Sequence, residues 1–282
     1  MSYPYFFISR ENVSDNTIFI TGKNYNHLVR VLRVKSGDKV EISDNEAKRY
    51  ITEVAEIKKE KAILLIKKVR NITKSYPMLT LFLSILKKDA MELAIQKTAE
   101  IGIDEIVPVF SGRVVVNIDK NKIGSRISRW NEIAAGASKQ CRRDFLCRVF
   151  NAVKINSLNT SLFDIFFIPV ENNFFSKDCI SIGEIADFFK SRKDRFKNGI
   201  RKDKYAVRSE EDKPKSKNGL KKIGYLIGPE GGFEDKELEI LIKKGAVPVN
   251  FGKNILRAET ASIYFLSVLD YLFKTLNIYQ CY

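Results

Sequence analysis

The sequence predicts two folded domains, a small β-barrel over residues 1–75 and an α/β domain with a parallel sheet over residues 76–282. Three observations support this division. The first 75 residues hold short β-rich runs separated by turn sequences, whereas strand and helix patterns alternate from Leu79 onward. The length of 282 residues is ample for two cores. A hydrophobic share of 44% with a charged share of 29% is typical of a globular chain.

The barrel is predicted from runs rich in β-branched and aromatic residues. These runs are Thr17–Ile20, Lys39–Ile42, Tyr50–Ala55 and Ala62–Val69. Turn-forming residues separate them, as in the Ser-Gly-Asp sequence at positions 36–38. The segment HLVRVLR at positions 27–33 lies between the first two runs, and we interpret it as a short helix packed on the strands.

The second domain opens with an apolar strand followed by a helix. Leu79–Leu86 is the strand, and Asp89 with Glu92 three residues later is typical of a capping box that starts a helix over Ala90–Ile101. Gly102 supplies the stop signal of that helix. The later elements alternate in the same way: strands at Ile106–Phe110, Ile165–Val170, Ile223–Ile227 and Ala246–Phe251, and helices at Trp130–Ser138, Asp235–Lys244 and Thr260–Leu276.

One stretch breaks the alternation. Residues 172–222 are polar and Lys-rich, and we expect a surface insertion or a disordered linker there, with a weak apolar helical pattern near its start. Within it, residues 186–222 hold 14 basic and 6 acidic side chains, so this stretch alone carries +8 of the formal net charge of +15. The barrel holds 15 basic and 9 acidic side chains. This excess predicts a polyanionic partner.

The composition also excludes several classes of protein. The single histidine makes a zinc site with two histidines impossible, and the four cysteines form no C-x-x-C pair, so no metal is expected. Scattered thiols favour a reduced, cytoplasmic protein. The chain shows neither a signal peptide at its start nor an apolar run of the roughly 18 residues that a membrane helix needs.

Two loops at the carboxyl ends of predicted parallel strands carry the chemistry. Gly228–Gly232 follows one strand, and its glycines let the backbone approach a ligand closely. This loop is neither a dinucleotide-binding motif nor a P-loop, and the alternative interpretation is a purely structural turn between strand and helix. The second loop holds Arg257 and Glu259, which a structural interpretation would make a solvated pair or a helix cap. Open α/β sheets bind their ligands at this edge, which favours a ligand-binding or catalytic function for both loops over a purely structural one.

A basic segment follows the Trp130–Ser138 helix. Gln140, Arg142 and Arg143 lie in it, and Arg113 follows the Ile106–Phe110 strand. Arginine forks suit phosphate, so a contact with a nucleic-acid backbone is one interpretation and a solvated helix end is the other. His27 is interpreted as a packing residue, because a lone imidazole without a visible partner is weak support for catalysis.

Taken together, five segments resemble the RsmE family of SPOUT-superfamily methyltransferases. They are HLVRVLR at 27–33, KKDAMELAIQKTAEIGIDEIVPV at 87–109, ASKQCRR at 137–143, LIGPEGGF at 226–233 and GKNILRAETA at 252–261. Members of that family methylate N3 of a uridine in 16S ribosomal RNA of the small subunit and use S-adenosyl-L-methionine. The matching segments occur in the family's order and cover most of the chain outside residues 172–222. Lys139 departs from the family pattern, which usually has glutamate there.

The resemblance implies a fold, a cofactor site and partners. It implies a PUA-like barrel that binds RNA, a knotted α/β methyltransferase domain with a deep trefoil knot, and a homodimer. The RNA contacts it implies are Arg30, Arg33, Arg113, Gln140, Arg142 and Arg143. The cofactor site it implies consists of Val170, Glu171, Leu226, Ile227, Gly228, Glu230, Gly231, Gly232, Gly252, Ile255, Leu256, Arg257, Thr260 and Ala261.

The expected reaction is transfer of a methyl group from a sulfonium to N3 of the uridine. N3 carries a weakly acidic proton, so the enzyme must remove it or stabilise the anion. We hypothesise that Arg257 stabilises this charge, that Glu259 orients Arg257, and that Glu230 orders the cofactor loop. Two alternatives stay open: a non-catalytic RNA-binding or ribosome-assembly protein, and a methyltransferase that modifies the ribose 2′-hydroxyl of RNA.

Overall fold

The structure is a computed structural model that describes residues 3–114, 122–170, 179–198, 220–278 and 280–281. The chain forms two compact units. The first contains the described residues up to 74 together with residues 135–146, and the second contains residues 75–134 and the described residues from 147 to 281. The chain passes from the first unit to the second between residues 74 and 75. The segment 135–146 joins the first unit although it lies far along the chain.

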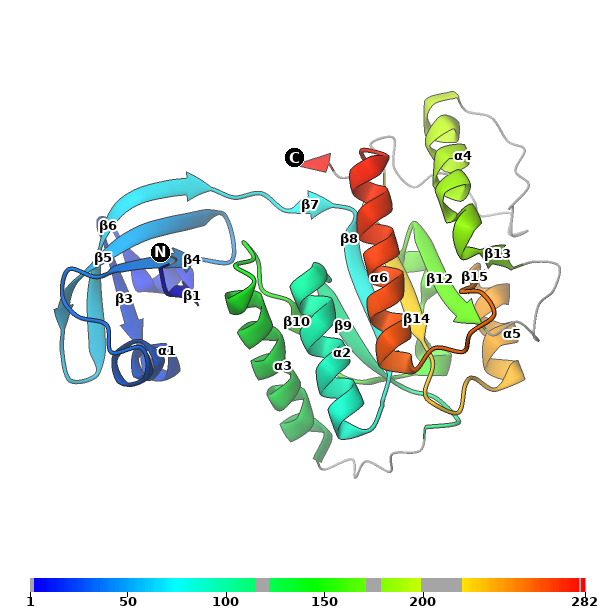
Figure 1. Ribbon diagram of the computed structural model, residues 1–282, viewed down its shortest axis with the longest axis horizontal. Coiled ribbons are helices and arrows are strands. Elements are labelled where there is room, and N and C mark those ends of the chain that lie inside the picture. The colour runs from blue at the N-terminus through cyan, green and yellow to red at the C-terminus, as the bar shows by residue number, and fades with distance from the viewer. Residues whose placement is uncertain (1–2, 115–121, 171–178, 199–219, 279, 282) are drawn as a thin grey trace. The chain divides into compact units, whose positions relative to one another are not determined.

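The first unit is built on a curled, six-stranded sheet (Figure 1). Its strands are β1 (Tyr5–Phe7), β2 (Val13–Ser14), β3 (Thr17–Thr21), β4 (Lys39–Ser43), β5 (Lys48–Ile57) and β6 (Lys61–Asn71). They lie in the order β1-β4-β5-β6-β3-β2, and all neighbours are antiparallel except β1 and β4. The four predicted strands are therefore present, whereas the short strands β1 and β2 were not predicted.

A short helical segment packs against this sheet, as the HLVRVLR pattern predicts. It consists of α1 (Gly22–Asn26) and a π-helical turn over His27–Val31. Leu28 is fully buried in the core of the unit. That core also contains alternate residues of the strands, such as Val40, Ile42 and Leu64. One face of each strand is thus apolar and faces inward, as expected for a half-exposed antiparallel sheet.

The segment 135–146 is held on the first unit by hydrogen bonds with several loops and strands. The Ser43 hydroxyl donates to the Asp144 carbonyl over 2.7 Å, and the Leu146 amide donates to the Asn45 side chain over 2.7 Å. Tyr5 Oη donates to the Arg143 carbonyl over 2.6 Å. Burial is the main cause that raises the pKa of Tyr5, to about 12, so this phenol stays a donor at physiological pH.

Asp44 orders the turn between β4 and β5. Its side chain is buried, and one carboxylate oxygen accepts the backbone N–H groups of Glu46, Ala47 and Lys48 at 2.8–3.0 Å. Burial alone would raise the pKa of Asp44, but these N–H donors outweigh burial and lower the pKa below its ordinary value of 3.8. Asp44 therefore stabilises the folded barrel through its ionised form.

Replacing Asp44 with asparagine should destabilise the protein by about 1–3 kcal/mol at pH 7, because the amide accepts these N–H groups without the charge. A carboxyl whose folded pKa is depressed contributes above its unfolded pKa and loses this contribution as pH falls through the folded pKa. The difference between wild type and Asp44→Asn should thus shrink below about pH 4. Urea unfolding at pH 7 and at pH 3 measures this difference in the free energy of unfolding. Asp15→Asn is the control, because Asp15 is exposed. A pH-independent difference would contradict this account.

The second unit contains a sheet of parallel strands. Its strands are β8 (Met78–Ser84), β9 (Glu105–Phe110), β10 (Arg148–Val149), β11 (Val153–Lys154), β12 (Ile165–Val170), β13 (Ile180–Ser181), β14 (Lys222–Ile227) and β15 (Val247–Asn250). The order is β10-β9-β8-β14-β12-β15-β13, with β11 also paired to β9. A separate antiparallel pair joins β7 (Ser75–Tyr76) to β16 (Gln280–Cys281).

Helices cover both faces of the parallel sheet (Figure 1). They are α2 (Lys88–Ile101), α3 (Ile123–Gln140), α4 (Ile185–Asn198), α5 (Asp235–Lys243) and α6 (Ala258–Thr275). On one face, α6 lies beside α2 and packs Phe265 against Phe167 and Tyr225. On the other face, Leu238 and Leu241 of α5 cluster with Phe166 and other residues of the sheet. The predicted α/β class with a β-barrel unit at the N-terminus is confirmed.

The structure corrects the extent of the expected insertion. Residues 180–198 lie inside the range 172–222, yet β13 pairs with β15 and α4 packs Phe188 and Phe189 against Phe167. These two phenylalanines are buried, and the single apolar face that they form was too short a pattern to outweigh the surrounding charge. The rest of the basic run, residues 199–219, lies outside the described residues.

One further expectation, the capping box of α2, is corrected by local geometry. The capping box of Asp89 and Glu92 is wrong, because α2 begins at Lys88, which places Asp89 inside the first turn. Within the described ranges, no helix is long and apolar enough to cross a membrane. The same residues contain no group of three or more His, Cys, Asp or Glu that could hold a metal ion.

Candidate functional site

Five parallel strands end at one edge of the sheet. Strands β9, β8, β14, β12 and β15 are neighbours and all run in the same direction. Their last residues, Phe110, Ser84, Ile227, Val170 and Asn250, therefore lie at the same end. Both glycine loops singled out from the sequence leave this edge, on either side of β12. Open α/β sheets bind ligands at such an edge.

The loop after β14 is shaped by its glycines. The Gly232 amide donates to the Pro229 carbonyl over 2.9 Å, and Gly232 has a φ of +70°, which favours glycine. A Cβ at Gly231 would lie 3.3 Å from the Arg113 carbonyl oxygen, so a side chain there would press on the neighbouring loop. A Cβ at Gly232 would meet no atom within 4 Å, which shows open space beside the backbone.

Glu237 ties this loop to the loop that follows β9. It is buried, one of its oxygens accepts the Gly112 amide at 2.8 Å, and the other accepts the Glu234 amide at 2.9 Å. Arg113 adds a weaker contact, from its guanidinium to the Gly231 carbonyl at 3.4 Å. From the sequence, Glu237 was predicted only to lie in the helix Asp235–Lys244. Its capping-box position three residues after Glu234 was the signal that could have identified it.

Glu230 lies close to the start of α2. Its carboxylate accepts the Lys87 backbone amide at 3.5 Å, at the limit of a hydrogen bond. Lys87 is the N-cap residue of α2, and a carboxylate is favoured at a helix N-terminus. The contact joins the loop after β14 to the loop after β8. This placement supports the predicted function of Glu230 in ordering the loop.

The loop after β15 leads into α6. Gly252 has a φ of +105°, and its amide donates to the Asn250 side chain over 2.7 Å. Arg257 is the N-cap residue of α6, and its side chain makes no capping hydrogen bond. The first backbone N–H groups of α6 therefore lack a capping side chain, and they add a partial positive charge to the exposed guanidinium of Arg257.

The structure does not join Arg257 to Glu259. Among the described residues, no hydrogen bond or ion pair connects the two side chains, although both are placed. They occupy the N-cap and second positions of α6, and residues two apart on a helix do not face each other. The hypothesis that Glu259 orients Arg257 through a direct contact is therefore not supported.

The other predicted cofactor residues divide by exposure. Leu226, Ile227 and Ala261 are buried, and Leu226 belongs to the core between the sheet and α5, so this residue has only its backbone to offer. Ile255 is 77% exposed and Thr260 is exposed, whereas Val170, Gly228 and Leu256 are half-buried. Glu171 lies outside the described residues.

These loops fit a ligand that has both polar edges and an apolar surface. A Cβ at Gly252, as at Gly232, would meet no atom within 4 Å, so a ligand can approach the backbone of both loops. Backbone N–H and C=O groups can read a purine and a ribose, while Ile255 and Leu256 offer apolar surface. These polar and apolar groups thus suit S-adenosyl-L-methionine. Among the described residues of these loops there is no cluster of metal-binding side chains.

The predicted RNA-binding residues do not all lie in one unit. Arg30 and Arg33 are exposed on the barrel unit, and Gln140, Arg142 and Arg143 belong to the segment 135–146 of that unit. Arg113 belongs to the parallel-sheet unit, where it borders Gly231.

Arg142 takes part in an ion-pair cluster of the barrel unit. Its guanidinium contacts the Glu41 carboxylate at 3.0 Å and also donates to the Tyr3 carbonyl. Glu41 and Asp144 both bind Arg49, at 2.7 and 2.8 Å. Burial alone would lower the pKa of Arg49. The two carboxylates outweigh burial and raise its pKa above the ordinary value, so the residue stays charged. These contacts give Arg142 a structural function, and its contact with RNA stays a prediction.

Lys139 is held in the same region. Its ammonium donates to the Asn24 side chain over 3.0 Å and lies 5.5 Å from the centre of the Phe6 ring. Burial lowers the pKa of Lys139. Lysine at this position therefore bonds to the helical segment of the barrel unit rather than extending into solvent.

Two family descriptions match the chain. The family described as "RNA methyltransferase domain" matches residues 74–178 and 179–270. The family described as "RNA methyltransferase PUA domain" matches residues 20–67. The two matches divide the chain close to residue 75, as the structure does.

Individual relatives match over nearly the whole chain. "Ribosomal RNA small subunit methyltransferase E" of Bacillus subtilis is 29% identical over 256 residues, which cover 90% of both chains. The solved structure of the Neisseria gonorrhoeae protein of that name, bound to S-adenosyl methionine, has a TM-score of 0.72 at 23% identity and covers 96% of this chain and 98% of the other. A Legionella pneumophila methyltransferase structure with bound SAM has a TM-score of 0.75 at 23% identity, over 98% of each chain. At these identities, the two solved structures show that the fold is shared.

Proposed function

Because the chain belongs to the RNA methyltransferase family whose two domains it contains, we propose that it methylates ribosomal RNA of the small subunit with S-adenosyl-L-methionine as the methyl donor. The main structural support for this proposal is the edge of the sheet where the loops after β14 and β15 flank the end of β12. Each loop has a glycine of positive φ, with open space beside the backbone. The names of the relatives support the substrate, since they act on small-subunit RNA by name.

We propose that the two glycine loops hold the cofactor mainly through their backbones. Gly232 and Gly252 would leave the backbone accessible, whereas Gly228 and Gly231 would allow the first loop to pack closely on Phe233 and Arg113. Glu230 and Glu237 would order this first loop. The remaining predicted contacts keep their place in this proposal; they are Val170, Glu171, Leu226, Ile227, Ile255, Leu256, Arg257, Thr260 and Ala261. S-adenosyl-L-methionine, when bound, supplies a methyl group on a positively charged sulfonium.

The target atom we propose is N3 of a uridine. Loss of the N3 proton leaves negative charge on the base, and the exposed Arg257 guanidinium at the N-terminus of α6 is placed to stabilise it. Glu259 is half-buried in the first turn of α6. Since it does not contact Arg257, we propose that it acts on the RNA base as the acceptor of the N3 proton.

Family resemblance and surface chemistry favour a homodimer. On α6, Tyr264 and Tyr271 lie seven residues apart on an outward face and are 36% and 66% exposed. Ile255, in the loop before α6, is 77% exposed. Tyrosine is enriched in protein interfaces, so we propose that this face contacts a second copy. Light scattering of the purified protein tests the proposal.

We also propose a cytoplasmic location, because ribosomal RNA is the proposed substrate of this protein.

Calorimetry with S-adenosyl-L-methionine separates the enzyme from a non-catalytic RNA-binding protein of the same fold. We expect saturable binding, followed by transfer of labelled methyl groups to small-subunit RNA or to the assembled subunit. The absence of cofactor binding by protein that is shown to be folded would contradict the proposed function. Binding without transfer to either form of the substrate would favour the non-catalytic alternative.

A further inference from the structure

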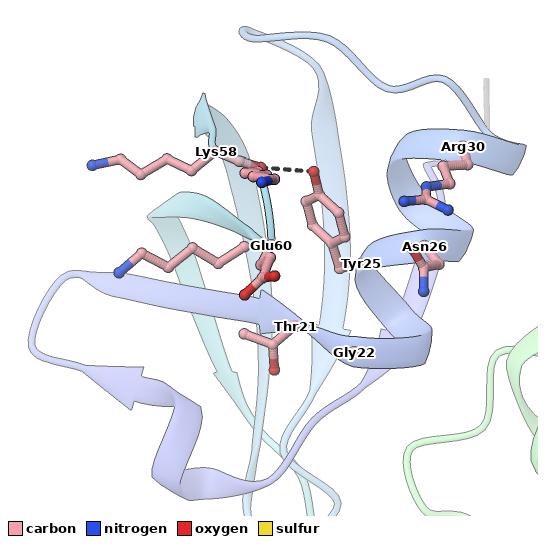
Figure 2. A pocket seen from close by; sticks show the side chains of 9 residues that line it. Thr21, Gly22, Tyr25, Asn26, Arg30, Lys58 and Glu60 are labelled. Atoms are coloured by element: carbon pink, nitrogen blue, oxygen red, sulfur yellow. Dashed lines mark hydrogen bonds between the residues drawn. The ribbon is translucent and has the colours of Figure 1, made fainter.

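The barrel unit contains an open hollow of about 880 Å³. One wall is the helical segment, with Asn26 and Arg30, and the opposite wall is the turn between β5 and β6, with Lys58, Lys59, Glu60 and Lys61 (Figure 2). Thr21, at the end of β3, also lines the hollow. The hollow lies entirely within one unit, far along the chain from the glycine loops.

The lining of this hollow is strongly basic. It contains four cationic side chains and one carboxylate, that of Glu60. Within the part of the chain that the structure describes, the side chains of Arg30 and Lys59 make no hydrogen bond or ion pair, and both are exposed. Lys58 pairs with Glu56 at 3.2 Å on the surface, and Lys61 lies 5.4 Å from the centre of the Phe19 ring. At least two cations are therefore available to a ligand.

The two walls are fixed to each other. Tyr25 is buried, and its hydroxyl donates to the Lys58 carbonyl over 2.6 Å, across the floor of the hollow (Figure 2). The Lys58 amide donates to the Lys61 carbonyl over 2.8 Å, which closes the turn. The cations are thus presented by a framework formed before a ligand arrives, and a preformed site lowers the entropic cost of binding.

We propose that this hollow binds the phosphate backbone of a single-stranded segment of the RNA substrate; the proposal rests on the proposed function and assigns the barrel its binding site. The cations lie on both walls of an open hollow, which suits an extended polyanion that passes between them. Thr21 and Asn26 add hydroxyl and amide groups that can bond to ribose hydroxyls and phosphate oxygens. The carboxylate of Glu60 opposes the phosphate and limits the affinity.

The test compares full-length variants for binding to transcribed small-subunit RNA over a range of salt concentrations. For Arg30→Ala/Lys59→Ala we expect weaker binding and a flatter dependence of log K on log salt, by about 0.7 for each phosphate of a single strand that the variant no longer binds. For Glu60→Gln we expect tighter binding, by about twofold to fivefold, as repulsion is removed. The matched control is Lys35→Ala/Lys68→Ala, which removes two exposed lysines of the same unit outside the hollow.

Opposite effects of the lysine–arginine and glutamate variants support the proposal, since damage to folding would weaken binding in both. Salt slopes of Arg30→Ala/Lys59→Ala that equal those of the control pair would overturn it. Binding of the same variants to polyglutamate is measured as a second probe. If Arg30→Ala/Lys59→Ala loses polyglutamate binding while its RNA binding is unchanged, the proposal is overturned in favour of an acidic protein partner. Methyl transfer by the wild-type protein is measured in parallel: its absence contradicts the proposed function, whereas normal transfer with unchanged slopes contradicts the hollow alone.

Discussion

Replacing Arg257 with alanine is expected to lower the single-turnover rate of methyl transfer by about 10²–10³-fold, the usual effect of removing one donor to a developing anion. Arg257 is exposed at the N-terminus of α6, and its side chain makes no capping hydrogen bond. Its charge is thus available to the substrate rather than used for folding. Stability should therefore change little, and the loss should appear in the chemical step.

The measurement uses saturating RNA and S-adenosyl-L-methionine, so that binding does not limit the rate. Lys253→Ala is the matched control, because Lys253 is an exposed cation of the same loop. Arg257→Lys should recover part of the rate, since it restores the charge without the planar fork. If cofactor binding and methyl transfer by Arg257→Ala both stay near wild type, Arg257 has no part in the reaction.

The second large effect is expected at Glu237. Replacing it with alanine removes the acceptor for the Gly112 and Glu234 amides and should destabilise the second unit by about 1–3 kcal/mol. The loops after β9 and β14 are then no longer tied together by this carboxylate. We expect the dissociation constant of S-adenosyl-L-methionine to rise about tenfold or more, which corresponds to about 1.4 kcal/mol.

Calorimetry measures this affinity, on protein that circular dichroism shows to be folded. Glu239→Ala is the control, since Glu239 is exposed on the same helix and pairs with Lys243 at 3.8 Å. Glu237→Gln should lie between wild type and Glu237→Ala, because one oxygen acceptor remains. An affinity of Glu237→Ala equal to that of Glu239→Ala would show that the buried carboxylate does not position the cofactor loop.

Most of the sheet framework was predictable because strand and helix patterns are local. The buried strand Ile165–Val170 and the amphipathic helix α6 follow from apolar spacing alone. The strand order is not local, and neither is the transfer of residues 135–146 to the barrel unit, which depends on Asp144 and Arg142 meeting Arg49 and Glu41. Contacts between residues about a hundred positions apart leave no periodic signal in one sequence.

The loops of the candidate site were predictable from the sequence, whereas the side chains that hold these loops in place were not. Glycine after an apolar strand locates the ligand edge, and the second loop at that edge contains Arg257. By contrast, Glu237 differs from its acidic neighbours only by being buried between two loops, which a composition pattern does not show. The same limit explains the error at 180–198, where buried Phe188 and Phe189 stand in a polar stretch. The charge of the barrel was visible in the sequence, whereas the hollow that gathers part of it was not.

The reaction we propose is the transfer of a methyl group to N3 of a uridine in small-subunit RNA. The most direct measurement is to incubate the full-length protein with labelled S-adenosyl-L-methionine and small-subunit RNA, free and in the assembled subunit, and to identify the labelled nucleoside after complete digestion. We expect label in 3-methyluridine, and loss of that label with Arg257→Ala. Label in a 2′-O-methylated nucleoside, or no labelled nucleoside from either form of the RNA, would contradict it.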